Sequence, residues 1–156
     1  MPSLPIPESG FAGDDGSVPP AVSTALTAYA AGEATYAEVM AVLQRSRLLV
    51  PVVAVASGES SDMATVLLTG NDGRTALLAF TGTEPLRAWD PEARPVPVAA
   101  ALAARSAAQD GADALVIDLA GPTRFVIEGD DLTAVAEGWT LARVGERTAW
   151  IRPATE

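Results

Sequence analysis

The side chains of this sequence that are able to do chemistry are carboxylates, hydroxyls, two tyrosines and ten arginines. There is no histidine, no cysteine and no lysine. A Ser-His-Asp triad, a thiolate nucleophile, a Schiff base and a P-loop lysine are therefore excluded. Histidine and cysteine metal ligands are excluded as well, so we expect neither a metal nor a cofactor. What remains is acid–base chemistry by carboxylates, or binding in a polar pocket.

Neighbouring carboxylates are poor evidence for catalysis here, because acid–base work of the glycosidase type needs two carboxylates held roughly 5–10 Å apart in a pocket. Asp90 fits a helix-end turn, and Asp130 fits a helix N-cap. The run 13–16 lacks the Asp-x-Asp-x-Asp-Gly pattern of a calcium loop, so we interpret it as a solvated turn. We therefore predict that the protein is not an enzyme. The neighbouring acids are Asp14/Asp15, Asp90/Glu92 and Asp130/Asp131.

A candidate ligand site combines Thr81, Thr83, Asp118 and Arg124. The two threonines lie between a predicted strand and a predicted helix, where backbone amides can hold an anion, although simple helix capping is the favoured interpretation of this segment. Asp118 ends the apolar run 114–117, so we expect its carboxylate to be half-buried and to need a donor. Arg124 is close enough in sequence to supply one. Alternatively, Asp118 caps its own turn by accepting backbone N–H groups.

A candidate interaction patch consists of Trp89 with Arg87 and Arg94. Tryptophan and arginine dominate interface energetics, and the prolines around this segment stiffen it. If Trp89 is exposed, an arginine stacked on it would complete a partner-binding patch. The competing interpretation is that Trp89 packs in the core.

The charge balance is ten basic against twenty acidic residues, a net charge of −10. This charge repels phosphate backbones and anionic lipid, so we expect neither nucleic-acid nor membrane binding. Residues 1–16 lack the basic and apolar regions of a secretory signal, and no window has the ~18 apolar residues of a membrane span. Because nothing indicates an oxidising compartment, we expect a cytoplasmic protein.

The length of 156 residues predicts one domain over 18–156, preceded by a flexible, proline-rich arm over 1–17. Patterns of apolar residues and of turn residues predict an α+β fold: a mixed or antiparallel central sheet with flanking helices. The predicted helices cover 21–31, a segment from Thr35, 83–90, 99–109 and 130–137. The predicted strands cover 48–56, 63–69, 74–80, 95–98, 114–119 and 124–127, and a last hairpin covers 141–151.

Several of these elements carry specific signals. Thr35 and Glu38 fit a capping box, and the apolar stripe that follows them predicts an N-terminal αα-hairpin packed on the sheet. Thr83 is expected to start the helix at 83–90. The Asn-Asp-Gly turn at 71–73 predicts a hairpin, and the strands 48–56, 63–69 and 74–80 are expected to form one antiparallel meander. Pro51 implies a sheet edge or a bulge.

Six strings of the sequence are familiar in combination: 10–16, 47–54, 61–64, 79–81, 89–98 and 118–122. In this order and spacing the chain resembles the N-terminal domain of the SseB family, in its actinobacterial form, over roughly residues 10–140. The resemblance implies no catalytic residues, because none is assigned in the family. The family pattern has a proline after position 118, where this chain has Leu119. Longer members of the family carry a second, C-terminal domain.

Two functions follow as hypotheses. The first is a non-catalytic protein-binding or regulatory module, monomeric or homodimeric, with an unknown protein partner; an assembly or stability factor is not distinguishable from it. The alternative is a small-ligand-binding or metabolic enzyme domain that uses Asp118, Thr81 and Arg124. A flat, exposed Trp-Arg patch would favour the first, and a deep polar pocket would favour the second.

Overall fold

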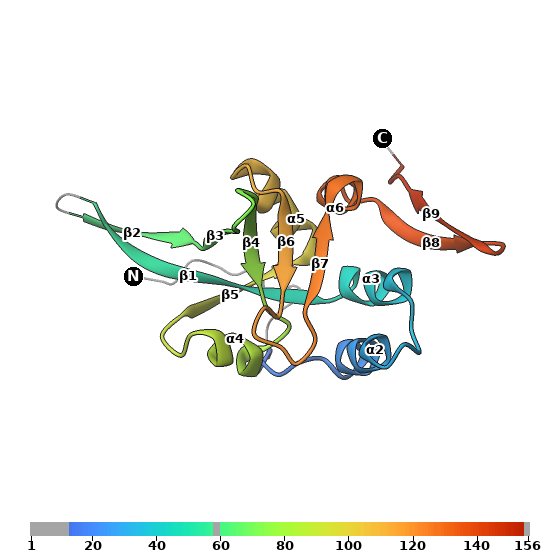
Figure 1. The fold of residues 1–156 in the computed structure, drawn as a ribbon, viewed down its shortest axis with the longest axis horizontal. Helices are drawn as coiled ribbons and strands as arrows, with labels where there is room; N and C mark the ends of the chain where they lie inside the picture. Colours follow the sequence, from blue (N-terminus) through green and yellow to red (C-terminus); the bar gives the residue numbers. More distant parts are fainter. Residues whose placement is uncertain (1–12, 58–59, 155–156) are drawn as a thin grey trace.

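The computed structural model describes residues 13–57 and 60–154, which form the mixed α+β fold that the sequence predicts (Figure 1). The helices are α2 (Pro20–Ala30), α3 (Tyr36–Gln44), α4 (Thr83–Trp89), α5 (Ala100–Gln109) and α6 (Gly129–Ala136). The strands are β1 (Arg47–Ser57), β2 (Ser60–Thr65), β3 (Leu67–Thr69), β4 (Thr75–Ala79), β5 (Arg94–Ala99), β6 (Ala114–Ile117), β7 (Phe125–Glu128), β8 (Thr140–Val144) and β9 (Arg147–Ile151).

The strands form two main sheets and a separate hairpin. One sheet has the order β3-β4-β6-β7, in which β4 and β6 are parallel and the other neighbours are antiparallel. The second sheet has the order β2-β1-β5 and is antiparallel throughout. A bridge joins the two sheets: the Leu49 N–H donates to the Phe80 carbonyl at 2.7 Å, and the Phe80 N–H donates back at 2.8 Å. Figure 1 shows β1 running across β4, β6 and β7.

The single meander expected over 48–56, 63–69 and 74–80 is wrong, because the middle segment is divided between the sheets. Its first part, β2, pairs with β1, and its last part, β3, pairs with β4. The chain changes sheet at Val66, which packs against the apolar cluster that contains Leu49 and Leu78. Val66 lies between β2 and β3, and its carbonyl accepts from the Leu78 N–H at 3.3 Å. The hairpin predicted around 71–73 is confirmed as β3–β4.

Pro51 lies in the middle strand of its sheet rather than at an edge. Backbone hydrogen-bonding groups alternate in direction along a strand. The backbone nitrogen of Pro51 therefore faces the same side of β1 as the N–H of Leu49, which is the side away from β5. Leu49 meets Phe80 on that side, and the pairing with β2 begins only at Val52. Pro51 therefore lies between the bridge to Phe80 and the start of the pairing with β2, where no backbone N–H donor is needed. This position explains why the proline is tolerated within the strand.

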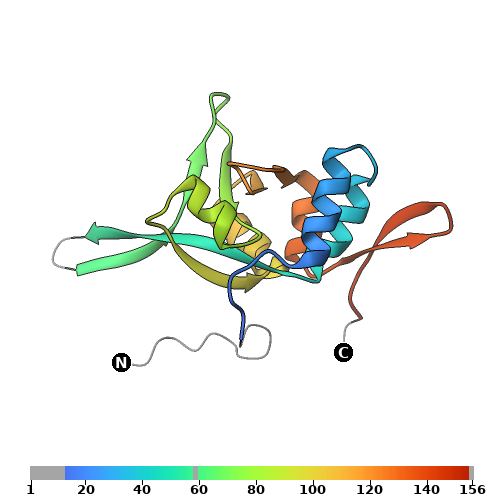
Figure 2. The same ribbon diagram turned by 90° about the horizontal axis from the view of Figure 1, so that it is seen from below.

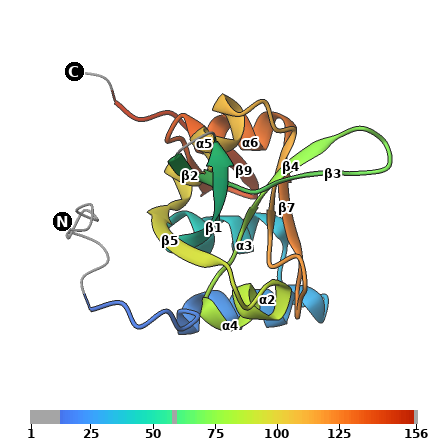
Figure 3. The same cartoon turned by 90° about the vertical axis from the view of Figure 1, so that its left-hand side faces the viewer.

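The main core lies between the β3-β4-β6-β7 sheet and the helices α3, α5 and α6, which cover one face of it (Figure 3). The predicted stripe of α3 is buried in this core: Val39, Met40 and Leu43 are at most 1 % exposed. Tyr36 stacks on Phe125 with ring centroids 4.6 Å apart. The capping box is confirmed, because Thr35 accepts from the Glu38 N–H while its own N–H donates to the Glu38 carboxylate.

The N-caps predicted at Thr83 and Asp130 are wrong by one or two residues. Helix α4 is preceded by Gly82 and helix α6 by Glu128, and neither residue makes a side-chain capping bond. Asp130 lies instead inside the first turn of α6, where its negative charge interacts favourably with the helix dipole.

Two hairpins extend from opposite sides of this body, β1–β2 on one side and β8–β9 on the other (Figure 2). The β8–β9 hairpin, predicted over 141–151, is attached through Gln44 of α3. The Gln44 amide donates to the Trp139 carbonyl at 2.6 Å and accepts from the Leu141 N–H at 3.1 Å.

Leu43→Ala tests the packing of α3. Leu43 is 1 % exposed, so its removal leaves a cavity in the main core. We expect the free energy of unfolding to fall by about 2–5 kcal/mol, as for other buried leucines. Chemical denaturation measures this loss. A loss below about 0.5 kcal/mol would place the stripe in solvent.

Candidate functional site

Asp118 and Thr81 form a buried pair at the carboxyl ends of the parallel strands β6 and β4. The Thr81 N–H donates to one carboxylate oxygen of Asp118 at 2.8 Å, and the Thr81 hydroxyl donates to the other at 2.7 Å. Asp118 is 1 % exposed and Thr81 is 2 % exposed. Because carboxyl ends of parallel strands are where open sheets place their ligands, this pair marks a candidate binding site.

The local backbone fixes the carboxylate of Asp118. Its φ angle is +56°, in the left-handed region that aspartate tolerates better than most residues. Its N–H donates to the Ala79 carbonyl at 3.0 Å, which continues the β4–β6 pairing by one residue. Burial raises the pKa of Asp118, and the two bonds from Thr81 only partly oppose that shift. No bond to an arginine compensates the buried charge among the contacts of the described residues.

On the other side of Thr81 lies the buried guanidinium of Arg47, at the start of β1. It donates to the Thr81 carbonyl at 2.5 Å, to the Ser17 carbonyl at 2.7 Å, and to both carboxylate oxygens of Asp14, at 2.6 and 3.2 Å. This hydrogen bonding holds the pKa of Asp14 below its usual value. The Arg47 side chain is 7 % exposed, so its charge is satisfied internally rather than by solvent.

These contacts anchor the N-terminal segment 13–18 against the turn between β4 and α4. The Thr83 N–H donates to the Gly16 carbonyl at 2.6 Å. A Cβ on Gly16 would lie 2.2 Å from the Thr83 hydroxyl, and one on Gly82 would lie 2.8 Å from the Val18 nitrogen. Position 82 therefore requires glycine because the clash is with backbone atoms, and position 16 favours glycine because its φ angle is +84°. The arm predicted over 1–17 is thus tied down at 13–17, and residues 1–12 lie outside the described residues.

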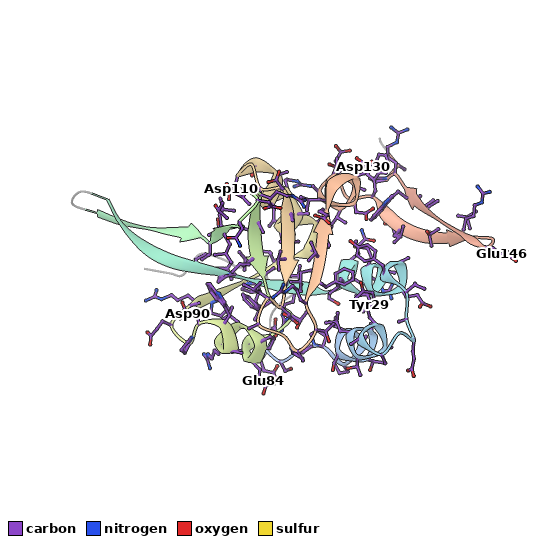
Figure 4. The ribbon with its side chains drawn as sticks, in the orientation of Figure 1. Tyr29, Glu84, Asp90, Asp110, Asp130 and Glu146 are labelled. Carbon is purple, nitrogen blue, oxygen red and sulfur yellow. The ribbon has the colours of Figure 1, made fainter. Side chains whose placement is uncertain are left out.

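A pocket of about 470 Å³ opens above the Thr81–Asp118 pair, between α2, α4 and the loop 118–124. Its volume is within the range of small-molecule sites. Val18 of the anchored segment forms part of its wall. The remaining lining residues are Ser23, Leu26 and Thr27 of α2, Glu84, Pro85 and Ala88 of α4, and Ala120, Gly121, Pro122 and Thr123 of the loop. Figure 4 shows Glu84 at the outer side of α4.

Of the four predicted ligand residues, the structure brings Thr81 and Asp118 together but leaves the other two outside the pocket. Arg124 is exposed and donates to the Leu119 carbonyl at 3.3 and 3.4 Å. The donors to the Asp118 carboxylate come from Thr81, so Arg124 does not supply the donor that its position in the sequence suggested. Thr83 lies instead in a shallow hollow beside the N-terminal segment. Within the residues that the structure describes, no three acidic side chains gather as a metal site.

The predicted interaction residues do not form one stacked patch. Trp89 is half-buried and stacks on Phe80, with centroids 5.6 Å apart. Arg87 and Arg94 are exposed. In the described part of the chain, the cation–π contact is instead between Arg152 and Trp139. Trp89 therefore packs, partly exposed, at the edge of the apolar cluster that contains Leu49, Leu78 and Phe80, and it is not a freely exposed anchor.

The sequence interpretation missed a second surface, the face of the β3-β4-β6-β7 sheet that the helices leave open (Figure 3). A shallow groove of about 310 Å³ runs across it. Leu68 is 38 % exposed there, and its apolar neighbours Val116, Leu119 and Val126 are partly exposed. The alternation of residues along the strands could have predicted this face. Leu77, Leu115 and Ile127 are buried on the face that the helices cover, so the residues next to them in sequence lie on the opposite face.

Two substitutions of Asp118 separate its hydrogen bonds from its charge. Asp118→Asn keeps an acceptor for the Thr81 N–H and tolerates the left-handed backbone, so we expect stability within about 1 kcal/mol of the parent. Asp118→Ala leaves the Thr81 donors unpaired and should cost about 1–3 kcal/mol.

Because burial raises the pKa of Asp118, the parent loses stability as the pH rises through that raised value, and the Asn variant does not. Chemical denaturation of the parent and of both variants at pH 4 and pH 7 measures the free energy of unfolding in each case. Equal losses of stability in Asp118→Asn and Asp118→Ala would contradict the first prediction. The same pH dependence in the parent and in Asp118→Asn would contradict the second.

Comparison with known proteins identifies the family. The model of the SseB protein N-terminal domain matches residues 22–134, which include most of α2, the two main sheets, the Thr81–Asp118 pair and most of α6. Searches among curated proteins and among solved structures found no significant match. None of the described helices is long and apolar enough to cross a membrane. The match covers well over half of the chain, and the chain therefore belongs to the family of SseB N-terminal domains.

Proposed function

We propose that this domain is a non-catalytic protein-binding module that docks its partner on the open face of the β3-β4-β6-β7 sheet. The observation that carries the proposal is the half-covered sheet: α3, α5 and α6 pack on one face, and the other face presents a groove lined by partly exposed aliphatic residues. Exposed aliphatic side chains grouped on an open sheet face make this groove a candidate interaction site.

The groove has the layout of a protein interface, with an apolar centre and a polar rim. Leu68 and Val126 stand on either side of it, and Arg74 and Glu128 form an exposed ion pair of 2.6 Å at its edge. Val116 and Leu119 also pack against the cluster that contains Trp89. This continuity gives Trp89 a place at the margin of the same surface, although the structure does not join it to Arg87 and Arg94.

The chemistry of the chain supports binding rather than catalysis. It contains no histidine, cysteine or lysine, and each oxygen of the buried Asp118 carboxylate accepts a hydrogen bond from Thr81. Acid–base catalysis by a carboxylate needs a suitable partner group, and among the described residues no second titratable side chain hydrogen-bonds to Asp118. The net charge of −10 disfavours nucleic acid and anionic membranes as partners, and we propose that the module acts in the cytoplasm.

A matched pair of leucine substitutions tests the docking surface. Leu68→Glu places a charge in the groove, whereas Leu102→Glu places one on α5, where Leu102 is 45 % exposed and faces solvent. We expect both variants to fold and only Leu68→Glu to weaken partner binding, by at least tenfold. The readout is affinity purification from native cytoplasm with quantitative mass spectrometry, followed by the affinity of each variant for the captured partner.

Photo-crosslinking supplies an independent readout. A photoreactive residue at 68 should crosslink to that partner, and the same residue at 102 should not. If Leu68→Glu retains the partner as fully as Leu102→Glu does, the open face is not the docking surface.

The absence of catalysis is tested by incubating the purified protein with a metabolite extract and following turnover by mass spectrometry. We expect no metabolite to be consumed. Turnover that Asp118→Asn abolishes would replace this proposal with an enzymatic function at the pocket.

A further inference from the structure

We propose that the pocket between α2, α4 and the loop 118–124 binds a small organic ammonium ion, a protonated amine attached to a compact apolar group. This site is separate from the proposed docking surface, and neither proposal depends on the other. The inference rests on the volume of the pocket, the chemistry of its walls and the signs of the charges that line it.

The pocket combines an apolar wall with hydroxyl groups. Leu26, Pro85, Ala88 and Pro122 supply aliphatic surface for the body of a ligand. Ser23 and Thr27 lie one turn apart on α2, and Thr123 lies in the loop, so hydroxyl oxygens are available from two elements. An ammonium group has three N–H donors and no acceptor, and hydroxyl oxygens satisfy such donors. A pocket of about 470 Å³ holds a ligand of this size.

The charges of the lining select a cation. Among the lining residues the ionisable ones are Asp118 and Glu84, both acidic. Arg47 lies behind Thr81, and it is bound to Asp14 and does not line the pocket. Because no basic side chain lines the pocket and Asp118 is buried beside it, we expect the pocket to disfavour phosphates and carboxylates.

Asp118 gives this field a buried source. Its carboxylate is 1 % exposed, and its hydrogen bonds come from the neutral groups of Thr81 rather than from a cation. Each carboxylate oxygen has a second acceptor position. A cation in the pocket above would supply a counter-charge to Asp118, whose hydrogen bonds come only from Thr81 among the described residues.

The experiment compares three probes of the same shape and different charge: benzylamine, benzyl alcohol and benzoate. Binding is followed at pH 7 by the chemical shifts of the backbone amides of Thr27, Thr81 and Thr123. We expect benzylamine to shift these amides saturably, benzyl alcohol to bind at least tenfold more weakly, and benzoate not to bind. Binding of benzoate or benzyl alcohol as tight as that of benzylamine, or no binding of benzylamine, would overturn the proposal.

Three variants locate the site. Asp118→Asn should weaken benzylamine binding at least tenfold while the protein remains folded, because it removes the charge and keeps the shape. Thr27→Trp, at an exposed position of α2, should fill the pocket and abolish binding. Leu68→Glu should leave benzylamine binding unchanged, which separates this proposal from the docking surface. Unchanged affinity in both Asp118→Asn and Thr27→Trp would place the amine elsewhere and contradict the proposal.

Discussion

The buried guanidinium of Arg47 is the constraint on which the arrangement of this domain depends. A buried charge is tolerated only when it is paired and hydrogen-bonded, and Arg47 finds its partners in two segments that are far from it in sequence. Asp14 supplies the counter-charge, and the carbonyls of Ser17 and Thr81 accept the remaining bonds. The start of β1, the N-terminal segment and the end of β4 are thereby fixed to one another. Thr81 then transmits this order to Asp118, at the end of β6.

This hydrogen-bond network lies beside two surfaces with different properties, the pocket next to Asp118 and the open face of the sheet. At the carboxyl ends of β4 and β6 it fixes the floor and one wall of a small acidic pocket. The open face of the sheet lies beyond it, where the groove is shallow and its centre is apolar. The match to the family model covers the residues of both regions. The two sites share β4 and β6, so each is positioned by the same parallel pair of strands.

The sequence predicts the local elements well because their signals are local. The capping box at Thr35, the apolar stripe of α3 and the turn at 71–73 each depend on residues within one or two turns. The family pattern, carried by several strings in order, was also sufficient to predict the family that the comparison identified. The division of 63–69 between two sheets was not predictable in this way, because it depends on Val66 reaching a cluster formed by distant residues.

The candidate site was predicted in part. Asp118 was expected to be half-buried and in need of a donor; it is 1 % exposed, and its donors come from Thr81, 37 residues away, rather than from nearby Arg124. Proximity in sequence was the only available argument, and tertiary contact outweighed it. The partnership of Arg47 with Asp14 spans 33 residues and has no local signal at all.

Amide hydrogen exchange in Arg47→Met tests the central role of Arg47 most directly. The methionine keeps most of the side-chain volume and removes every donor, and Arg74→Met, which removes an exposed ion pair, serves as the control. We predict that the Thr83 amide, which donates to Gly16, loses protection in Arg47→Met far more than the amides of β6 do, and that it keeps its protection in Arg74→Met. Retained protection of the Thr83 amide in Arg47→Met would show that the N-terminal segment is held without Arg47 and would contradict the account.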